Sequence, residues 1–419
     1  MKQALISHNK HWKEKYKHLF FRDIANILIQ KTHLKHIQIL TGIRRSGKSS
    51  IFKILINHLI NSGVNPLSIL YINLDDPFFS DIWKNSQKLY DLLILSEKIT
   101  GKKVEYLFLD EIQNVNNWEK FVKVIYDNET VKKIFITGSN AKLLEGEFAT
   151  LLSGRYLKEI IYPLSFQEVL RFNDINSYLD LLNNKAKVLN IIENMMEYGS
   201  FFEILNEKEF KRDILISYLE SIIYKDCIMN HKIKDVKFFR DFVNFVISNT
   251  ANLYSYNSLA KAVNSNENTV KSYLSFLEEA FLMYELNSFS FSLKKQLKSK
   301  KKSYVIDNGL LAQTSFRFTE EKGKLFENLV FSELKKQGYK IYFYNEKFEC
   351  DFLVKKENKL LALQVAYELN DFNFDREVRS LLKLPFKAEK YIITFNQENT
   401  YEDVTIIPFY EFFINKTKG

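Results

Sequence analysis

The sequence predicts an α/β fold whose first part is a parallel sheet, and three observations support this prediction. Short apolar segments alternate with helical segments between residues 36 and 165. One loop with two glycines, GIRRSGKS, joins such a strand to such a helix. Several apolar segments end in polar side chains. Alternating strands and helices favour a parallel sheet covered on both faces, with ligands at the carboxyl ends of its strands.

The elements of this first part are predicted from the pattern of apolar residues. Apolar residues form continuous runs in the expected strands and recur at helical spacing in the segments between the strands. The expected strands are 36–40, 68–75, 104–109, 133–138 and 156–164, and the expected helices are 49–60, a stretch reaching about residue 99, 118–128 and 141–152.

Length and composition set broad limits. A chain of 419 residues with 46% apolar residues allows about three domains. We expect a cytoplasmic protein without a membrane segment, because no signal peptide and no apolar run of membrane-spanning length is found. The two cysteines, Cys227 and Cys350, lie far apart and show no metal-binding spacing. The formal charge of +9 indicates only weak affinity for a polyanion.

The loop that starts at Gly42 matches the pattern G-x-x-x-x-G-K-[ST], which is informative only between a strand and a helix. Both neighbours are expected here, so we predict a nucleotide site rather than a chance match. Loop N–H groups and the helix dipole favour phosphate, Lys48 would reach the β- and γ-phosphates, and the Ser49 hydroxyl would serve Mg²⁺. The expected phosphate-binding residues are Gly42, Ile43, Arg44, Arg45, Ser46, Gly47, Lys48, Ser49 and Ser50.

Two carboxylates end the apolar segment VEYLFLDE. Asp110 suits the Mg²⁺-associated position after a strand of this class, and Glu111 is placed to polarise an attacking water. The alternative is that both acids cap the following helix.

The segment KKIFITGSN, residues 132–140, is another strand that ends in polar residues. Ser139 or Asn140 would contact the γ-phosphate or the attacking water. An ordinary turn with a helix cap explains either residue equally well.

The segments TGIRRSGKSS, LFLDEIQNVNNWEKFVK, FITGSNAKLL and LSGRYLKEIIYPLSFQEVL resemble a family of archaeal and bacterial AAA-type P-loop ATPases. The resemblance is densest from about 36 to 170 and implies an ATPase core at 1–165. It also implies a helical lid at 166–235 and a C-terminal region with a nuclease-like end. ATP is favoured over GTP, because the sequence shows no guanine-specific pattern.

The resemblance draws attention to Arg155 in LSGR. This residue could act as an arginine finger at a neighbouring chain, which requires oligomers, or as a sensor of the γ-phosphate in its own chain. The alternative is a surface arginine in a loop.

Residues 254–286 read as helix, short turn, helix and strand, which is the winged helix-turn-helix pattern of a region expected at 236–302. A DNA-binding version would expose Asn268, Thr269, Lys271 and Ser272 in a major groove. The same fold also serves as a protein-interaction module.

The stretch KKQLKSKKK, residues 294–302, contains six lysines in nine residues. It can neutralise nucleic-acid phosphates, or it can be a solvated loop. Together with the winged-helix pattern it makes residues 254–302 the expected DNA-contacting part.

The last part, residues 303–419, resembles a PD-(D/E)xK nuclease fold. Glu327 and Asp351 occupy its first two carboxylate positions. The third position reads Gln364-Val365-Ala366, so the lysine of that motif is missing and we expect a weak or inactive nuclease.

These patterns predict an Mg²⁺-dependent ATPase that is coupled to DNA. Glu111, Arg155 and Asn140 are its expected catalytic residues, and Ser49 and Asp110 its expected metal-binding residues. The alternative is a signalling or remodelling ATPase that acts on a protein partner without nucleic acid.

Overall fold

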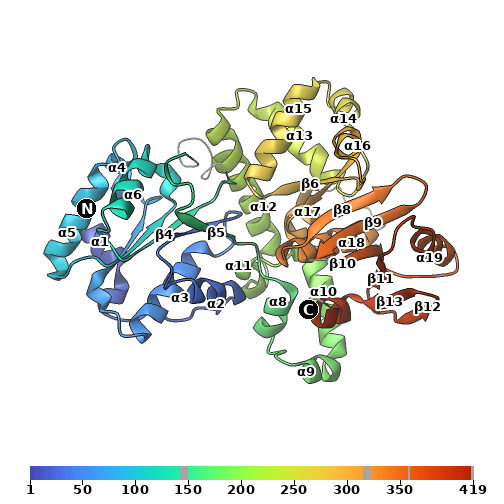
Figure 1. The fold of residues 1–419 in the computed structure, drawn as a ribbon, viewed down its shortest axis with the longest axis horizontal. Coiled ribbons are helices and arrows are strands. Elements are labelled where there is room, and N and C mark those ends of the chain that lie inside the picture. The colour runs from blue at the N-terminus through green and yellow to red at the C-terminus, as the bar shows by residue number, and fades with distance from the viewer. Residues whose placement is uncertain (142–149, 315–321, 357–358, 417–419) are drawn as a thin grey trace. The chain divides into compact units, whose positions relative to one another are not determined.

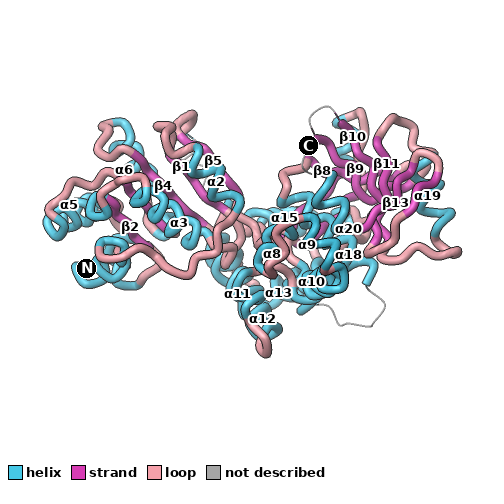
Figure 2. Tube along the Cα trace, turned by 90° about the horizontal axis from the view of Figure 1, so that it is seen from below, coloured by secondary structure: helices cyan, strands magenta, loops and turns pink. Residues whose placement is uncertain are grey.

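The computed structural model describes residues 1–141, 150–314, 322–356 and 359–416. The chain forms two compact units, Met1–Ile161 and Tyr162–Gly419. The boundary lies close to the predicted end of the ATPase core at residue 165. Figures 1 and 2 show the elements of both units.

The first unit contains a five-stranded parallel sheet with the strand order β2-β3-β4-β1-β5. The predicted strands are thereby confirmed, with shifts of a few residues at their ends. The strands are β1 Ile37–Thr41, β2 Ile69–Asn73, β3 Tyr106–Asp110, β4 Lys133–Gly138 and β5 Tyr156–Ile160.

Helices cover both faces of this sheet (Figure 1). Successive side chains of a strand point to opposite faces, so a strand buried on both sides is apolar throughout. In β3, Leu107 and Leu109 belong to one apolar cluster and Phe108 to the other. The helices are α1 Lys2–His8, α2 Asp23–Gln30, α3 Lys48–Asn61, α4 Ser80–Trp83, α5 Lys88–Thr100 and α6 Trp118–Asp127. Most of the helix predicted at 141–152 lies outside the described residues.

The second unit begins with helices, as predicted for residues 166 to 250. Ser165 caps α8 through a capping box with Glu168, which fixes where that helix starts. The helices are α8 Phe166–Phe172, α9 Tyr178–Asn183, α10 Lys185–Tyr198, α11 Phe202–Asn206, α12 Lys211–Ser221, a π-helical turn Ile222–Met229 and α13 Val236–Ser248.

The predicted order of helix, turn, helix and strand is present in α14 Tyr256–Ala262, α15 Glu267–Glu279 and β6 Met283–Asn287. Strand β6 pairs in antiparallel fashion with β7 Lys301–Val305, and the connection between them carries α16 Leu293–Lys298. The predicted boundary between residues 302 and 303 divides β7, so it is not a domain boundary.

The C-terminal part is a mixed six-stranded sheet with the order β12-β13-β11-β10-β9-β8 (Figure 1). Its core joins apolar residues of β9, β10 and β11 to helix α19. The elements are α17 Asn308–Thr314, α18 Lys322–Lys336, β8 Lys340–Asn345, β9 Glu349–Lys356, β10 Lys359–Ala366, α19 Phe374–Leu382, β11 Glu389–Thr394, β12 Asn399–Tyr401, β13 Val404–Pro408 and α20 Phe409–Glu411, followed by a π-helical turn Phe412–Lys416.

None of the helices in the described parts of the chain is long and apolar enough to cross a membrane.

Candidate nucleotide site

The loop predicted to bind phosphate connects β1 to α3, and its glycines are required by its shape. Gly42 has φ +140°, and a Cβ atom there would lie 2.0 Å from the carbonyl oxygen of Ile161. Gly47 has φ +93° and immediately precedes the first residue of α3. Side chains at these positions would be strained or would clash, so glycine keeps the loop tight at the helix N-terminus.

Lys48 is the first residue of α3, and its side chain turns back into the loop. Its ammonium group donates to the carbonyl oxygens of Gly42 at 2.9 Å and Ile43 at 3.1 Å. Arg22, next to the start of α2, donates to the Ser46 carbonyl oxygen at 3.1 Å and is buried. The sequence pattern gave no signal for Arg22, because it lies outside the loop motif. Two cations therefore lie at the loop, which favours an anionic ligand.

The other predicted loop residues differ in burial. Ile43 and Ser46 are buried, Arg44 and Ser49 are half-buried, and Arg45 and Ser50 are exposed. Arg45 has a left-handed backbone with φ +68°.

Asp110, the last residue of β3, is buried among hydroxyl groups. Its carboxylate accepts hydrogen bonds from Tyr71 at 2.6 Å, from Thr137 and from Ser49. Burial, together with the charge of Glu111, raises the pKa of Asp110, and the three hydroxyl donors oppose this rise. The structure thus brings together Ser49 and Asp110, the two residues predicted to serve Mg²⁺. Carboxylate and hydroxyl oxygens are ligands that suit this ion.

Glu111 lies beside Asp110 in a conformation that is rare for residues other than glycine, with φ +54°. Its backbone N–H donates to the Thr137 hydroxyl at 2.9 Å, and its carboxylate accepts from the Gln113 amide at 2.5 Å. Left-handed residues of this kind often occur at functional sites. Thr137 and Gln113 therefore fix the backbone and the side chain of Glu111.

Ser139 and Asn140 follow β4 at the same edge of the sheet, and both are buried. The Gln113 amide also lies 3.4 Å from the Ser139 hydroxyl, so Ser139 takes part in the arrangement around Glu111. A direct catalytic role of Asn140 stays a prediction.

Sequence reasoning missed Tyr71, Thr137 and Gln113. Burial and the charge of Asp110 raise the pKa of Tyr71, so its hydroxyl remains a donor to that carboxylate. Tyr71 and Thr137 lie within buried strands, where a tyrosine or threonine looks like an ordinary core residue. Gln113 could have been found, because a polar side chain two residues after the predicted catalytic carboxylate of Glu111 can reach it.

Arg155 lies at the opposite edge of the sheet. Its carbonyl oxygen accepts from the Ile37 N–H, at the amino ends of β1 and β5, whereas the loop follows the carboxyl end of β1. A five-residue strand spans roughly 16 Å. The Arg155 side chain pairs with Asp127 at 3.2 Å. The structure therefore does not support a γ-phosphate sensor in the same chain, and the role at a neighbouring chain stays a prediction.

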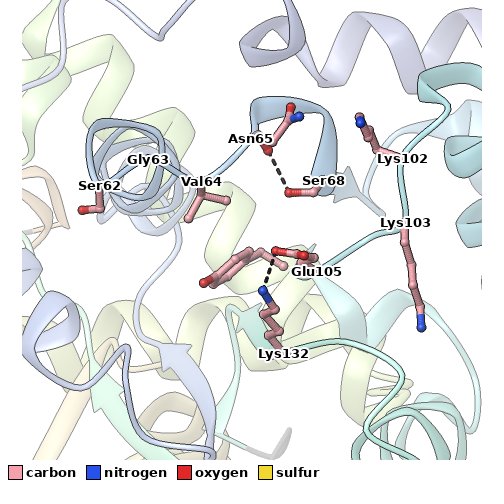
Figure 3. Close-up of a pocket in the computed structure, with 10 residues that line it drawn as sticks. Ser62, Gly63, Val64, Asn65, Ser68, Lys102, Lys103, Glu105 and Lys132 are labelled. Atoms are coloured by element: carbon pink, nitrogen blue, oxygen red, sulfur yellow. Dashed lines mark hydrogen bonds and ion pairs between the residues drawn. The ribbon is translucent and has the colours of Figure 1, made fainter.

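A cavity of about 470 Å³ also lies at this opposite edge (Figure 3). Ser68, Glu105 and Lys132, which line it, are found at the amino ends of β2, β3 and β4. Lys132 is paired with Glu105 at 3.0 Å. The cavity is therefore separate from the residues that converge at the loop.

Comparison with known proteins assigns the first unit to a family. Residues 34–170 match the model described as an AAA domain, and residues 189–321 and 322–412 match two domains of unknown function, DUF8612 and DUF4143. An uncharacterized protein of Methanocaldococcus jannaschii is 35% identical over 392 residues, which cover 88% of this chain and 84% of the relative. The chain belongs to the AAA-domain P-loop ATPase family. An uncharacterized protein of Haemophilus influenzae is 31% identical, covering 88% and 91% of the two chains.

Solved structures with AAA-type cores are similar only at a coarse level. AMPPCP-bound DnaA from Aquifex aeolicus matches with a TM-score of 0.27 and 16% identity, covering 61% of this chain and 86% of that chain. PCH-2 of C. elegans matches with a TM-score of 0.30 and 17% identity, covering 52% and 65%. At such TM-scores these likenesses carry no argument about function. The AAA-domain assignment confirms the predicted family, and the nuclease-like interpretation of the C-terminal part stays a prediction.

The residues predicted to contact DNA fall into three groups. On α15, Asn268, Lys271 and Ser272 are exposed and Thr269 is half-buried, but Lys271 is paired with Glu267 at 3.5 Å. In the lysine-rich stretch, Lys301 and Lys302 are buried in β7, so they do not face a nucleic acid. The exposed lysines are Lys294, Lys295, Lys298 and Lys300, and within the described parts of the chain they form no ion pair.

Proposed function

We propose that the chain is an Mg²⁺-dependent ATPase. The observation that carries the proposal is the convergence of four predicted residues at one edge of the sheet. The Lys48 ammonium lies inside the loop, the Ser49 hydroxyl is hydrogen-bonded to the Asp110 carboxylate, and Glu111 lies beside it. These are the parts that phosphoryl transfer to water requires.

Each residue would have a separate task. The loop N–H groups and Lys48 hold the phosphates, and Ser49 and Asp110 hold Mg²⁺, which when bound neutralises charge on the phosphate oxygens. Glu111 orients a water and accepts its proton. The water oxygen bonds to the γ-phosphorus, the bond to the β,γ-bridging oxygen breaks, and ADP and phosphate leave. Gln113 and Thr137 keep Glu111 in position.

The test is phosphate release from ATP with and without Mg²⁺. We expect Glu111→Gln to lower kcat by about 10² or more and to keep nucleotide affinity, because it removes the proton acceptor but not the loop. Lys48→Ala should lose nucleotide affinity. Glu129→Gln, an exposed residue at the opposite edge, and Lys53→Ala, on the same helix as Lys48, are the matched controls. Full turnover by Glu111→Gln would overturn the proposed role of that carboxylate.

Coupling to nucleic acid is the second part of the proposal, and the exposed part of the lysine-rich stretch supports it. Lys294, Lys295, Lys298 and Lys300 present four positive charges on and next to α16. Phe291 and Leu297, which are 88% and 67% exposed, lie among them. Lysines favour phosphate, whereas exposed apolar side chains favour a protein partner. The exposed Phe291 and Leu297 therefore support the alternative, an ATPase that acts on a protein partner.

Salt dependence separates the two partners. If duplex DNA stimulates turnover, replacing the four lysines by glutamine should reduce the slope of log affinity against log salt by up to about 3.6, or 0.9 for each lost phosphate contact. A control chain carries glutamine at four exposed lysines of the first unit, Lys13, Lys84, Lys98 and Lys103. Turnover that neither duplex nor single-stranded DNA changes would favour the protein partner.

A further inference from the structure

A buried group of charged side chains lies in the second unit, away from the nucleotide site. Lys302 on β7 is 5% exposed, although it belongs to the lysine-rich stretch. Its ammonium nitrogen lies 3.5 Å from a carboxylate oxygen of Glu327 on α18 and 3.4 Å from one of Asp351 on β9. The two carboxylates predicted to bind metal in a nuclease-like site therefore meet at one lysine.

Each of the two carboxylates also accepts a hydrogen bond from a group other than Lys302. Tyr304 lies two residues after Lys302, on the same face of β7, and its hydroxyl donates to the same Glu327 oxygen at 2.6 Å. The second oxygen of Asp351 accepts from the Val365 N–H at 3.0 Å. The arrangement joins β7, α18, β9 and β10.

Gln364, which stands at the third carboxylate position of the nuclease motif, already makes hydrogen bonds through both ends of its amide group. Its carbonyl oxygen accepts from the Asp351 N–H at 2.7 Å, and its amide donates to Glu377 at 2.6 Å. Arg376 pairs with the other oxygen of Glu377 at 2.5 Å. Gln364 thus holds the backbone of β9 and is not available as a metal ligand in this arrangement.

Lys302 places one positive charge against the two carboxylates of the group. Burial lowers the pKa of Lys302, but Glu327, Asp351 and Glu349 outweigh burial and raise it, so the side chain stays an ammonium ion. A buried charge is tolerated when it is paired and hydrogen-bonded, as it is here. In the described parts of the chain, no group of three or more histidine, cysteine or acidic side chains could hold a metal ion.

We propose that Lys302 is the resident cation of this carboxylate pair: its ammonium group excludes a divalent metal ion from Glu327 and Asp351, and its removal turns the pair into a metal site. A divalent cation and the ammonium ion would compete for the same two carboxylates. The proposal concerns the second unit alone and does not depend on ATP hydrolysis.

The test measures thermal unfolding of the full chain with and without millimolar Mn²⁺, and Mn²⁺ binding by calorimetry. Wild type and Lys347→Met, which changes an exposed lysine between β8 and β9, should not respond. Lys302→Met should unfold at a lower temperature, and Mn²⁺ should raise its midpoint by roughly 5 °C. Adding Asp351→Asn to Lys302→Met should abolish the response. Lys302→Gln, which keeps a hydrogen-bond donor, replaces Lys302→Met if the latter does not fold.

Two results would overturn the proposal. One is a Mn²⁺-dependent rise in wild type that Asp351→Asn removes, because the native chain would then hold a metal. The other is a folded Lys302 variant that shows neither binding nor a shift in midpoint. Metal-dependent cleavage of DNA by wild type that is lost in Asp351→Ala would overturn the proposal for the same reason as the first result.

Discussion

Two glycines of the phosphate loop serve different purposes at the scale of single residues. Gly47 allows a left-handed turn before α3, whereas Gly42 allows the loop to lie against the Ile161 carbonyl group. The requirement for glycine at position 42 is steric. An added Cβ would clash with backbone atoms of Ile161, and no side-chain rotation can remove that clash. Gly42 therefore ties the loop to the end of β5.

Replacing Gly42 by alanine should push the loop away from β5. We expect Gly42→Ala to weaken ATP binding by about tenfold or more, which corresponds to roughly 1.4 kcal/mol. The control is Gly63→Ala, because Gly63 has φ +90° but no atom within 4 Å of an added Cβ. That variant should lose some stability but keep its affinity for ATP. Equal ATP affinities of Gly42→Ala and wild type, measured by calorimetry, would contradict this account of the loop.

Part of the candidate site follows local patterns in the sequence. Lys48, Ser49 and Asp110 could be predicted because the loop and the strand end each have a recognisable spacing. Tyr71 and Thr137 could not, because each contacts Asp110 from another strand of the sheet. Their role depends on the strand order and register, which apolar periodicity does not specify.

At the scale of elements, strand β7 has a different role from the one its composition indicated. Four of the six lysines in the stretch 294–302 are exposed on and around α16, but Lys301 and Lys302 are buried in the strand. Lys302 is buried because two carboxylates from α18 and β9 lie next to it. Those partners are distant in sequence, so a lysine run alone gave no reason to separate the two groups.

The environment of Glu327 on α18 makes the contribution of this side chain to the stability of the fold depend on pH. Burial, together with the charge of Asp351, raises the pKa of Glu327 to about 7, although Lys302 and Tyr304 oppose the rise. A carboxyl with a raised pKa in the folded state stabilises the fold at low pH and loses this contribution as pH rises towards 7. Stability from this group should therefore fall between about pH 4.5 and pH 7.

Glu327→Gln should remove this dependence, because glutamine can still accept from Tyr304 but does not ionise. We expect the midpoint of unfolding of Glu327→Gln, relative to wild type, to be higher at pH 8 than at pH 5 by on the order of 5 °C. Glu346→Gln, at an exposed position after β8, is the control and should show no such change. A difference between variant and wild type that is constant from pH 5 to pH 8 would exclude an ionising Glu327.

At the scale of the whole molecule, the position of Arg155 bears on assembly. Its place at the amino ends of β1 and β5 separates it from the phosphate loop of its own chain. If Arg155 contributes to catalysis, its side chain must act at the nucleotide site of a second chain. Its ion pair with the half-exposed Asp127 would have to open for that contact, at a cost that is small for a pair near the surface.

Mixing the Arg155→Ala and Lys48→Ala variants tests whether Arg155 acts at the nucleotide site of a second chain. Arg155→Ala keeps its own loop but donates no arginine, and Lys48→Ala donates the arginine but does not hold nucleotide. We expect each variant to hydrolyse ATP at least 10³-fold more slowly than wild type, and their mixture to recover a measurable part of the activity. Asp127→Ala, which frees the Arg155 side chain, should remain active. Full activity of Arg155→Ala on its own would show that the residue has no catalytic role.

The burial of Lys302 also determines how this protein can be divided for separate study. A fragment that starts at residue 303 would contain Glu327 and Asp351 but not the cation between them, and it would keep only part of a strand that pairs with β6. The complementary fragment would expose the edge of β6, and exposed strand edges promote aggregation. Expression of the C-terminal sheet should therefore begin before β6, so that the hairpin and its lysine remain with the carboxylates they contact.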